Sequence, residues 1–370
     1  MPADRRTELP SCYAMVHEGL EDLAGAEIAQ TLGGKIKRAG NGIVVFRLDD
    51  IDRSILQLRT TEDVFLYAWG TDELSYRAKD LESIERWTDR VRWDSLLKIH
   101  HAVTPKPKGK TTYHFVTQMS GVHGYRRVDA KKAMMRGLIG KLPGSWRYAE
   151  ENASVEIWLT INGAMAVCGM RLSDKTMRHR SYKHEHLPAS IRPTIAAVMV
   201  RLAELKPDQT VLDPMCGAGT LLAEAHLSTR GKKTTAGTDW PMRFLGGDLD
   251  PSHLRAAQAN LRRFGITDLR TWDARELPLE DASMDRIVCN PPFGKQLETP
   301  EAIGPLYKQS VREMDRVLHP GGKAVLIVAD AAALRSAIER VGWKEQRHVQ
   351  LRMLGQRAFI GVYRKPSAGA

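Results

Sequence analysis

The stretch Asn290-Pro291-Pro292-Phe293 is the part of the sequence best equipped to do chemistry. Each proline fixes its own φ, lacks an N–H donor and pushes the residue before it into an extended conformation. The Asn290 amide oxygen and the Pro291 carbonyl are therefore held stiffly as hydrogen-bond acceptors, and Phe293 follows as a flat apolar surface. Two acceptors beside a stacking ring would hold the exocyclic NH2 group of a nucleobase. The alternative interpretation is a proline-rich turn with a core phenylalanine.

Three other ligand-type features lie upstream, each at the end of a predicted strand. The first strand, 210–213, runs into a turn containing Gly217 and Gly219, which lacks the lysine of a P-loop and the spacing of a dinucleotide fingerprint. Asp248 ends the second strand, where an acid can accept both hydroxyls of a ribose. Asp273 follows the third strand, where it could meet an adenine amine. Ligands of an open α/β sheet bind at these strand ends, so the four features together indicate one pocket.

The elements that position these residues form a regular strand and helix alternation from about residue 187 onward. This alternation is typical of a doubly wound α/β domain. We expect it to open with a helix from about Ser190 to Leu205. Residues 1–97 read instead as a small α+β unit with short strands and helices. The segment 228–243, which is rich in Gly, Thr and Lys, has no role that we can assign.

The positive charge of the chain is concentrated in its middle. The net charge is +11, yet residues 98–190 hold 16 Lys and Arg against 6 Asp and Glu, whereas residues 1–97 hold 13 against 18. The middle segment is therefore the best candidate for a phosphate-binding surface. Near its end Arg178, Arg180 and Lys183 surround Tyr182, a pattern that suits an RNA surface, although a solvated charged loop is the alternative.

Composition narrows the class of protein further. The four cysteines show no CxxC spacing, which argues against a zinc site, an iron–sulfur cluster and a disulfide framework. The N-terminus lacks the apolar region of a signal peptide, and no run of apolar residues is long enough to span a membrane. We therefore expect a cytoplasmic protein without metal or membrane contact.

The motifs resemble those of a known enzyme family. Residues 210–330 resemble a class I S-adenosylmethionine-dependent methyltransferase that methylates amines, whose signature is Asp/Asn/Ser-Pro-Pro-aromatic. The stretch 178–224, with Asp-Pro-Met-Cys-Gly-Ala-Gly-Thr, is similar to the THUMP-domain RNA methyltransferases, which make N2-methylguanosine in tRNA. Segments 19–23 and 159–182 resemble the upstream domains of that group. The resemblance implies a Rossmann-like doubly wound domain over 187–370, preceded by a ferredoxin-like α+β domain over 1–97 and a THUMP RNA-binding domain over 98–186.

The same resemblance implies S-adenosyl-L-methionine as cofactor, tRNA as partner, no metal, and a monomer. In the catalytic motif, Asn290 and the Pro291 carbonyl would hold the two hydrogens of the target amine, Pro292 would stiffen the turn and Phe293 would stack the base. The implied cofactor-binding residues are Asp213, Met215, Gly217, Gly219, Thr220, Asp248, Asp273, Ala274 and Asn290. The expected RNA-binding residues are Arg126, Arg127, Arg178, Arg180 and Lys183.

The implied reaction is methylation of a guanine N2 amine in the tRNA acceptor stem, with position 6 as the specific candidate. Two alternatives stay open. The first is an amino-methyltransferase that acts on guanine N2 of rRNA or on adenine N6 of rRNA or DNA, since Asn-Pro-Pro-Phe suits either base. The second is a non-catalytic RNA-binding protein that retains the fold, against which the intact Asn290 and Asp248 argue.

Overall fold

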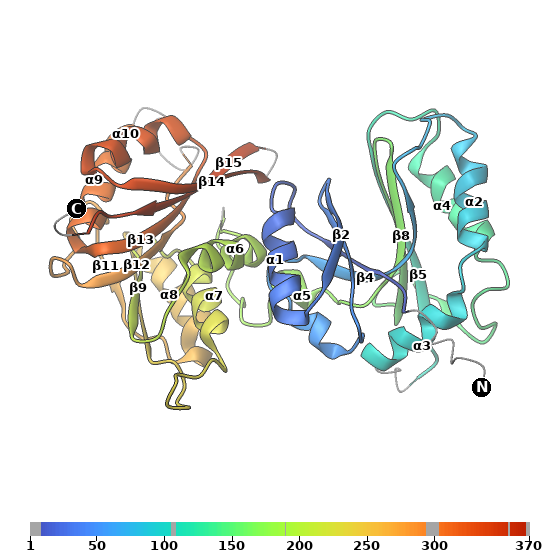
Figure 1. The fold of residues 1–370 in the computed structure, drawn as a ribbon, viewed down its shortest axis with the longest axis horizontal. Helices are drawn as coiled ribbons and strands as arrows, with labels where there is room; N and C mark the ends of the chain where they lie inside the picture. Colours follow the sequence, from blue (N-terminus) through green and yellow to red (C-terminus); the bar gives the residue numbers. More distant parts are fainter. Residues whose placement is uncertain (1–8, 105–108, 189, 294–302, 354–355, 368–370) are drawn as a thin grey trace, which may run out of the picture. The chain divides into compact units, whose positions relative to one another are not determined.

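The computed structural model describes residues 9–104, 109–188, 190–293, 303–353 and 356–367. The chain divides into two compact units (Figure 1). Unit 1 comprises Met1–Val16 and Glu21–Met177, and unit 2 comprises His17–Leu20 and Arg178–Ala370. Unit 2 thus begins upstream of the boundary expected at residue 187, because the segment 178–186 packs with the downstream domain. The separation of residues 1–186 into a ferredoxin-like and a THUMP domain stays a prediction.

Unit 1 is built on one eight-stranded sheet in the order β2-β3-β1-β4-β8-β7-β5-β6. Its strands are β1 (Cys12–Met15), β2 (Lys35–Gly40), β3 (Ile43–Arg47), β4 (Asp63–Thr71), β5 (Thr112–Ser120), β6 (Arg147–Tyr148), β7 (Val155–Asn162) and β8 (Met165–Arg171). Its helices are α1 (Glu21–Leu32), η1 (Arg53–Gln57), α2 (Asp80–Asp89), α3 (Trp93–Val103) and α4 (Arg127–Gly137), and α5 (Thr176–His179) leads into unit 2. The antiparallel pairing of β4 with β8 joins the strands of residues 1–97 to those of the basic middle segment.

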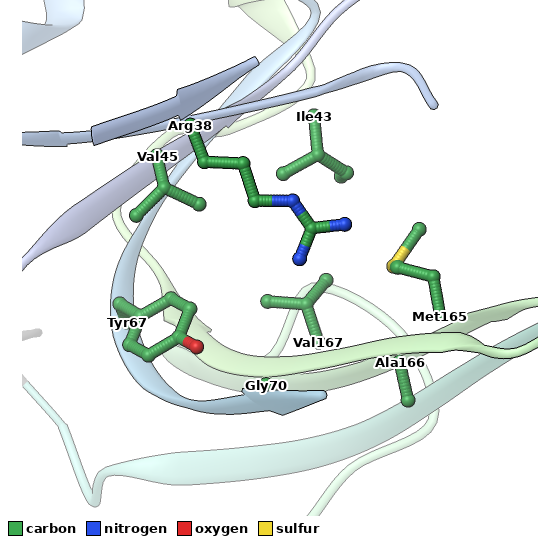
Figure 2. A pocket seen from close by; sticks show the side chains of 8 residues that line it. All are labelled: Arg38, Ile43, Val45, Tyr67, Gly70, Met165, Ala166 and Val167. Carbon is green, nitrogen blue, oxygen red and sulfur yellow. The ribbon is translucent and has the colours of Figure 1, made fainter. Parts of the chain in front are cut away.

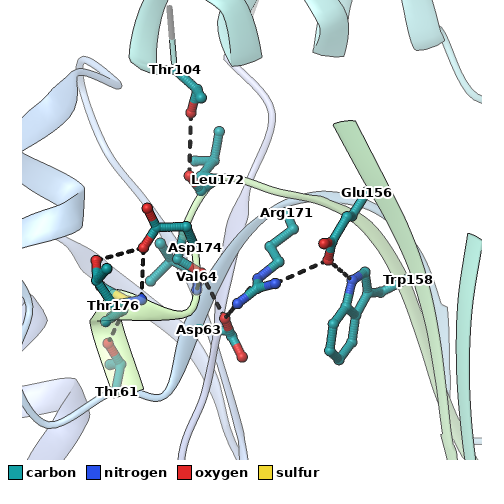
Figure 3. A network of polar contacts seen from close by, with 12 residues as sticks. Thr61, Asp63, Val64, Thr104, Glu156, Trp158, Arg171, Leu172, Asp174 and Thr176 are labelled. Carbon is teal, nitrogen blue, oxygen red and sulfur yellow. Dashed lines mark hydrogen bonds and ion pairs between the residues drawn. The ribbon is translucent and has the colours of Figure 1, made fainter. Parts of the chain in front are cut away.

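A buried ion-pair network reinforces this junction (Figure 3). Arg171 at the end of β8 donates from Nε to Asp63 Oδ1 on β4 over 2.7 Å, and from Nη1 to Glu156 Oε2 on β7 over 3.0 Å. Ser173 and Trp158 donate to the same two carboxylates over 2.8 and 2.7 Å. Because Arg171 and Asp63 are buried, each needs a charged or hydrogen-bonding partner, and the network supplies one across three strands.

Strand β1 of unit 1 buries both of its faces. Cys12 and Ala14 of β1 belong to the large core cluster of the unit, while Tyr13 between them joins a smaller cluster with Phe65 and Trp158. This alternation is the period of two that a strand imposes on its side chains. A cavity of about 200 Å³ adjoins the smaller cluster, and the Arg38 side chain extends into it from β2 (Figure 2). The cavity contains none of the predicted site residues.

Unit 2 is a seven-stranded sheet in the order β11-β10-β9-β12-β13-β15-β14. Its strands are β9 (Gln209–Asp213), β10 (Met242–Asp248), β11 (Leu269–Thr271), β12 (Met284–Cys289), β13 (Leu318–Val328), β14 (Lys344–Met353) and β15 (Gln356–Arg364). The first five are parallel to one another, and β15 pairs antiparallel with both β13 and β14. The predicted doubly wound Rossmann-like α/β fold is confirmed. The strand order reverses between β9 and β12, where such sheets bind ligands.

Helices cover both faces of this sheet (Figure 1). They are α6 (Pro193–Ala203), α7 (Thr220–Thr229), α8 (Pro251–Leu261), η2 (Arg262–Phe264), α9 (Ile303–Val317) and α10 (Ala331–Val341). Apolar residues of α7 and α8 form one core cluster, and those of α9 and α10 form another with the strands. The expected helix from Ser190 to Leu205 is present as α6. Strand β13 begins at Leu318, and its register against β12 contains an irregularity.

Candidate active site

The Asn-Pro-Pro-Phe motif directly follows β12, which lies between β9 and β13 in the centre of the sheet. Cys289, the last residue of β12, is fully buried, so the motif starts from a rigid base. Asn290 Oδ1 is buried and has no hydrogen-bond partner among the described residues. A buried acceptor without a partner costs free energy, and such atoms in native structures call for an explanation. An amine donor supplied by a bound molecule would satisfy this oxygen.

A side chain that the sequence analysis missed fixes the second proline. Tyr307 of α9 is 1% exposed, and its hydroxyl donates to the Pro292 carbonyl over 2.9 Å. This bond orients the peptide between Pro292 and Phe293 and occupies the Pro292 carbonyl. Phe293 is half-buried. Gly294, which follows Phe293 in the sequence, lies outside the described residues.

The glycine turn after β9 places backbone and carboxylate at the same edge of the sheet. Asp213 is 1% exposed, and burial raises the pKa of its carboxyl well above the usual range, with the nearby Asp248 charge adding to the effect. The Met215 N–H donates to Asp213 Oδ1 over 3.3 Å. Gly217 has a φ of 51°, and a Cβ added there would meet no atom within 4 Å. The turn therefore leaves open space in front of its backbone.

The next turn residues begin helix α7. Gly219, with a φ of 75°, is the N-cap of α7 and packs against Leu261, so that a side chain there would collide with α8. Thr220 follows as the first residue of the helix, and its Oγ1 is buried without a hydrogen-bond partner among the described residues. Asn290 and Thr220 thus each present an unsatisfied polar atom in unit 2.

Asp248 at the end of β10 is held from three sides. Its Oδ2 accepts from the Gly217 N–H over 2.9 Å, and its Oδ1 accepts from the Asp250 N–H over 3.1 Å and lies 2.9 Å from His253 Nδ1. The carboxylate is therefore oriented in advance and tied to the glycine turn. The sequence analysis predicted Asp248 but missed His253, which approaches it from α8.

The end of the third strand, β11, is followed by the predicted residue Asp273 and by Trp272, which the sequence analysis missed. Asp273 forms an ion pair with Arg275 over 2.6 Å, and hydrogen bonds from Arg275 hold the pKa of the Asp273 carboxyl below its usual value. Ala274 is buried in the core beside it. Trp272 lies against Gly247 so closely that any side chain there would overlap its ring, and its Nε1 donates to the Pro214 carbonyl over 3.0 Å. The indole thus braces the turn after Asp213.

These strand ends face one edge of the sheet because β11, β10, β9 and β12 are parallel neighbours. The edge combines the Asp213 and Asp248 carboxylates, open space beside Gly217 and the unsatisfied Asn290 acceptor. Two acids favour a ligand with positive charge, and a preoriented carboxylate suits a pair of hydroxyls. A molecule carrying a cationic end and a ribose would therefore satisfy the groups that this edge leaves open.

The predicted RNA-binding residues separate into two sets. Arg180 Nε and Tyr182 Oη both bind the buried Glu224 carboxylate, over 3.2 and 2.7 Å. Lys183 Nζ donates to Ser190 Oγ over 2.9 Å and to the Ile191 carbonyl over 3.0 Å, and burial lowers its pKa to about 8. These contacts do not fit an RNA-facing role for Arg180 and Lys183, because the two cations balance a buried acid and hold the segment 178–191 to unit 2.

The other set is accessible. Arg178 is half-buried, whereas Arg126 and Arg127 are exposed at the start of α4 in unit 1. Arg126 forms an ion pair with Asp129, which closes a capping box at the start of the helix. RNA binding by Arg126, Arg127 and Arg178 stays a prediction.

The described residues contain neither a candidate metal site nor a candidate membrane-spanning helix. In those ranges, no group of three or more His, Cys, Asp or Glu side chains is placed to hold a metal ion. None of the helices in the same ranges has the length and apolar character needed to cross a bilayer.

Comparison with known proteins shows which proteins this part of the chain resembles. Residues 180–358 match the family model described as RMKL-like, methyltransferase domain. The chain is 30% identical over 238 residues to the mouse tRNA (guanine(6)-N(2))-methyltransferase THUMP3, covering 60% of this chain and 45% of that protein. It is 34% identical over 189 residues to the mouse U6 snRNA (guanine-N(2))-methyltransferase THUMPD2, covering 50% and 32%. The chain thus spans less than half the length of these mammalian relatives.

Similarity over most of the chain is found with bacterial proteins. The tRNA (guanine(6)-N2)-methyltransferase of Thermus thermophilus is 26% identical over 331 residues, which are 88% of this chain and 91% of that protein. The crystal structure of TrmN from Thermus thermophilus superposes with a TM-score of 0.76 at 24% identity, covering 96% of this chain and 99% of that one. The motifs at the strand ends of unit 2 fall inside the family match. Residues 180–358 therefore match the methyltransferase domain of the RMKL-like family.

Proposed function

We propose that the chain is an S-adenosylmethionine-dependent methyltransferase that methylates a guanine N2 amine in RNA, with tRNA as the substrate. The observation that carries the proposal is the buried, unsatisfied Asn290 Oδ1 at the centre of the carboxyl edge of the sheet. An acceptor in that state is set to receive an N–H from outside the protein. The relatives named above act on guanine N2, which agrees with an amine as the target.

The cofactor supplies an activated methyl group on a positively charged sulfur. The residues of the edge fit it for the reasons given above: the Gly217 N–H holds the Asp248 carboxylate, which would accept the hydroxyls of a ribose, and Gly217 leaves room for a ligand beside its backbone. Asp213 would lie near the charged end, where a carboxylate offsets a cation. We infer that Met215, Gly219 and Thr220 shape the same pocket, with Asp273 and Ala274 at its adenine end.

Asn290 has two tasks in this proposal. By accepting one N–H of the target amine, together with the Pro291 carbonyl, it orients the nitrogen lone pair toward the methyl group. The same acceptors stabilise the positive charge that grows on the nitrogen, which is preorganised electrostatic catalysis. Tyr307 helps indirectly, because it holds the neighbouring Pro292 carbonyl in a fixed direction.

Positioning accounts for the remainder of the rate. A methyl transfer needs the amine, the carbon and the leaving sulfur in line, so holding the base is most of the work. Phe293 would stack the base, a contact worth about 1–3 kcal/mol. A guanine that is paired in a stem must first be flipped out of the helix. The product ammonium is acidic enough to lose its proton to Asn290 or water, so no carboxylate base is needed.

The test is to incubate the purified chain with isotopically labelled S-adenosylmethionine and unmodified tRNA, rRNA or U6 snRNA, and to analyse the nucleosides by mass spectrometry. We expect labelled N2-methylguanosine from tRNA, formed at least about a hundredfold more slowly by the Asn290→Ala variant. Labelled N6-methyladenosine would overturn the guanine assignment and leave the amine mechanism standing. Label in U6 snRNA alone would overturn tRNA as the substrate. A cytoplasmic monomer stays our expectation for the setting and the oligomeric state.

A further inference from the structure

The cavity of unit 1 receives its one cation through an irregularity in the edge strand β2. The register of β2 against β3 shifts between Ile36 and Arg38, so that Lys37 is an extra residue on β2. Ile36 pairs with Phe46 of the large core cluster, and Arg38 pairs with Val45, which packs against the smaller cluster. Residues two apart in a regular strand share one face, so the bulge turns Arg38 to the face opposite Ile36. The Arg38 side chain thereby reaches the cavity (Figure 2).

A second bulge makes room on the facing strand. The register of β4 against β8 shifts between Tyr67 and Trp69. Tyr67 packs against the smaller cluster and lines the cavity, whereas Trp69 belongs to the large core cluster on the other face. Without the bulge, Trp69 would share the face of Tyr67 and fill this space. Bulges are frequent next to binding sites because they re-aim side chains in this way.

The polar groups of the cavity suit an acid. Arg38 donates from Nη2 to Asp72, and no other hydrogen bond of this guanidinium is found among the described residues. A guanidinium has five donors in a planar fork, so most of them stay available to a bound molecule. Burial raises the pKa of the Tyr67 hydroxyl, which therefore stays protonated and can donate as well. Two donors, one of them charged, thus meet at the cavity.

The remaining walls are apolar. Besides Gly70, they consist of Ile43, Val45, Met165, Ala166 and Val167. An anion without an apolar part, such as phosphate, would lose hydration against these walls and gain only one cation. Pockets of this composition hold a mostly apolar molecule that a few polar groups orient.

We propose that the cavity binds a small carboxylate with a short branched aliphatic chain. The carboxylate accepts hydrogen bonds from Arg38 and Tyr67, and the chain packs against Val45, Met165 and Val167. A planar carboxylate matches the fork of a guanidinium, and such charge-assisted pairs are the strongest hydrogen bonds in proteins. All of these residues belong to unit 1, so the site does not depend on the proposed methyl transfer.

The test uses the full chain with isotopic labels on its methionine methyl groups, because Met165 lines the cavity and reports on it directly. The Met165 resonance is assigned with Met165→Leu. Isocaproate should shift this resonance with a dissociation constant of about 1 mM or lower, which is within reach of a ligand this small. The resonance of Met134, in the large core cluster, should stay in place. Isocaproamide, which has the same shape without the charge, should bind at least about tenfold more weakly.

Two variants test the donors, and two others serve as matched controls. Arg38→Met should weaken isocaproate binding at least about tenfold, and Tyr67→Phe about threefold or more. Lys35→Met removes a cation of the same strand, whose ion pair with Asp49 is exposed. Tyr13→Phe removes a hydroxyl of the smaller cluster that does not line the cavity. Neither control should change the affinity for isocaproate.

Three results would contradict the proposal. A Met165 resonance that is unshifted at about ten times the expected dissociation constant would exclude the site. Equal binding of isocaproamide, or displacement of isocaproate by inorganic phosphate, would refute the choice of an aliphatic carboxylate. Unchanged affinity in Arg38→Met, or an equal loss in Lys35→Met, would remove the role of Arg38. The titrations contain neither methyl donor nor RNA, so their outcome leaves the proposed reaction untouched.

Discussion

Replacing Asn290 with alanine should separate activity from stability. Its Oδ1 is buried and has no partner among the residues that the structure describes, so the folded state already carries the cost of an unsatisfied acceptor, roughly 1–3 kcal/mol. Removing the side chain removes that cost together with some packing. The free energy of unfolding should therefore change by less than about 1 kcal/mol. A structural asparagine would behave in the opposite way.

The effect on turnover should be large. In the transition state the same oxygen accepts a hydrogen bond from an amine that is becoming positively charged. Loss of one preorganised partner of this kind costs about 2.7–4 kcal/mol, or a factor of about 10² to 10³ in kcat. Affinity for the methyl donor should fall by much less than kcat.

Asn260 provides the matched comparison. It is fully buried in the same unit, and its amide accepts from the His184 and Glu185 N–H groups over 2.8 and 2.9 Å and donates to the Glu185 and Ala218 carbonyls. Asn260→Ala should lower the free energy of unfolding by about 2–4 kcal/mol, because it leaves several backbone groups unpaired.

Urea unfolding and single-turnover methylation of the two variants test the contrast directly. If Asn290→Ala unfolds as easily as Asn260→Ala while keeping near-normal turnover, Asn290 is a structural residue. The catalytic role assigned to its buried oxygen would then be wrong.

Three further predictions concern the hydroxyl of Tyr307 and the buried side chains of His100 and Asp213. Tyr307→Phe keeps the ring but loses the bond to the Pro292 carbonyl, so kcat should fall about tenfold at unchanged donor affinity; unchanged turnover would refute the positioning role. Burial lowers the pKa of His100 to about 4, so the unfolded chain binds a proton at this histidine before the folded chain does. Unit 1 should therefore lose about 3 kcal/mol of stability as pH falls from 6.5 to 4. His100→Asn should flatten this dependence in urea titrations, and an equal loss in the variant would contradict it. Burial raises the pKa of the Asp213 carboxyl, so the folded protein loses stability as pH rises and this group ionises. Asp213→Asn should therefore stabilise the free protein more at pH 8 than at pH 5 in thermal unfolding, while it weakens affinity for the methyl donor. A stabilisation that does not depend on pH would exclude this linkage.

The catalytic domain was predictable because its signals are local. Apolar runs mark β9, β10 and β12, and the polar residues that follow them in the sequence lie at the strand ends in the structure. Parallel strands place their carboxyl ends at one edge, so the pocket follows from the motifs without any knowledge of distant contacts.

Contacts between residues that are distant in the sequence leave no local pattern from which they could be predicted. Arg180 and Lys183 look like an RNA surface in sequence, but the acid that Arg180 binds, Glu224, lies on a helix 44 residues downstream. Tyr307 and His253 carry no motif and become relevant only because α9 and α8 bring them to the strand ends. The edge strand β2 is largely exposed and charged, so it shows no alternation of apolar residues.

The division of the first 186 residues into two domains stays a prediction. The sequence suggests two upstream domains because the charge changes sign near residue 97. The pairing of Phe65 in β4 with Arg171 in β8 crosses this boundary and makes one sheet of both parts. Pairings between residues so far apart leave no local pattern.

The same pairing has a consequence for synthesis on the ribosome. Strand β4 leaves the exit tunnel about a hundred residues before its partner β8, and at about 5–20 residues per second the delay is roughly 5–20 s. During that time one edge of an apolar strand, with Phe65 and Leu66 at its centre, has no hydrogen-bonding neighbour. Unpaired edges of this kind attract other strands. Nascent chains of this protein should therefore depend on chaperones until Arg171 has been added, and expression of residues 1–97 alone should yield aggregates.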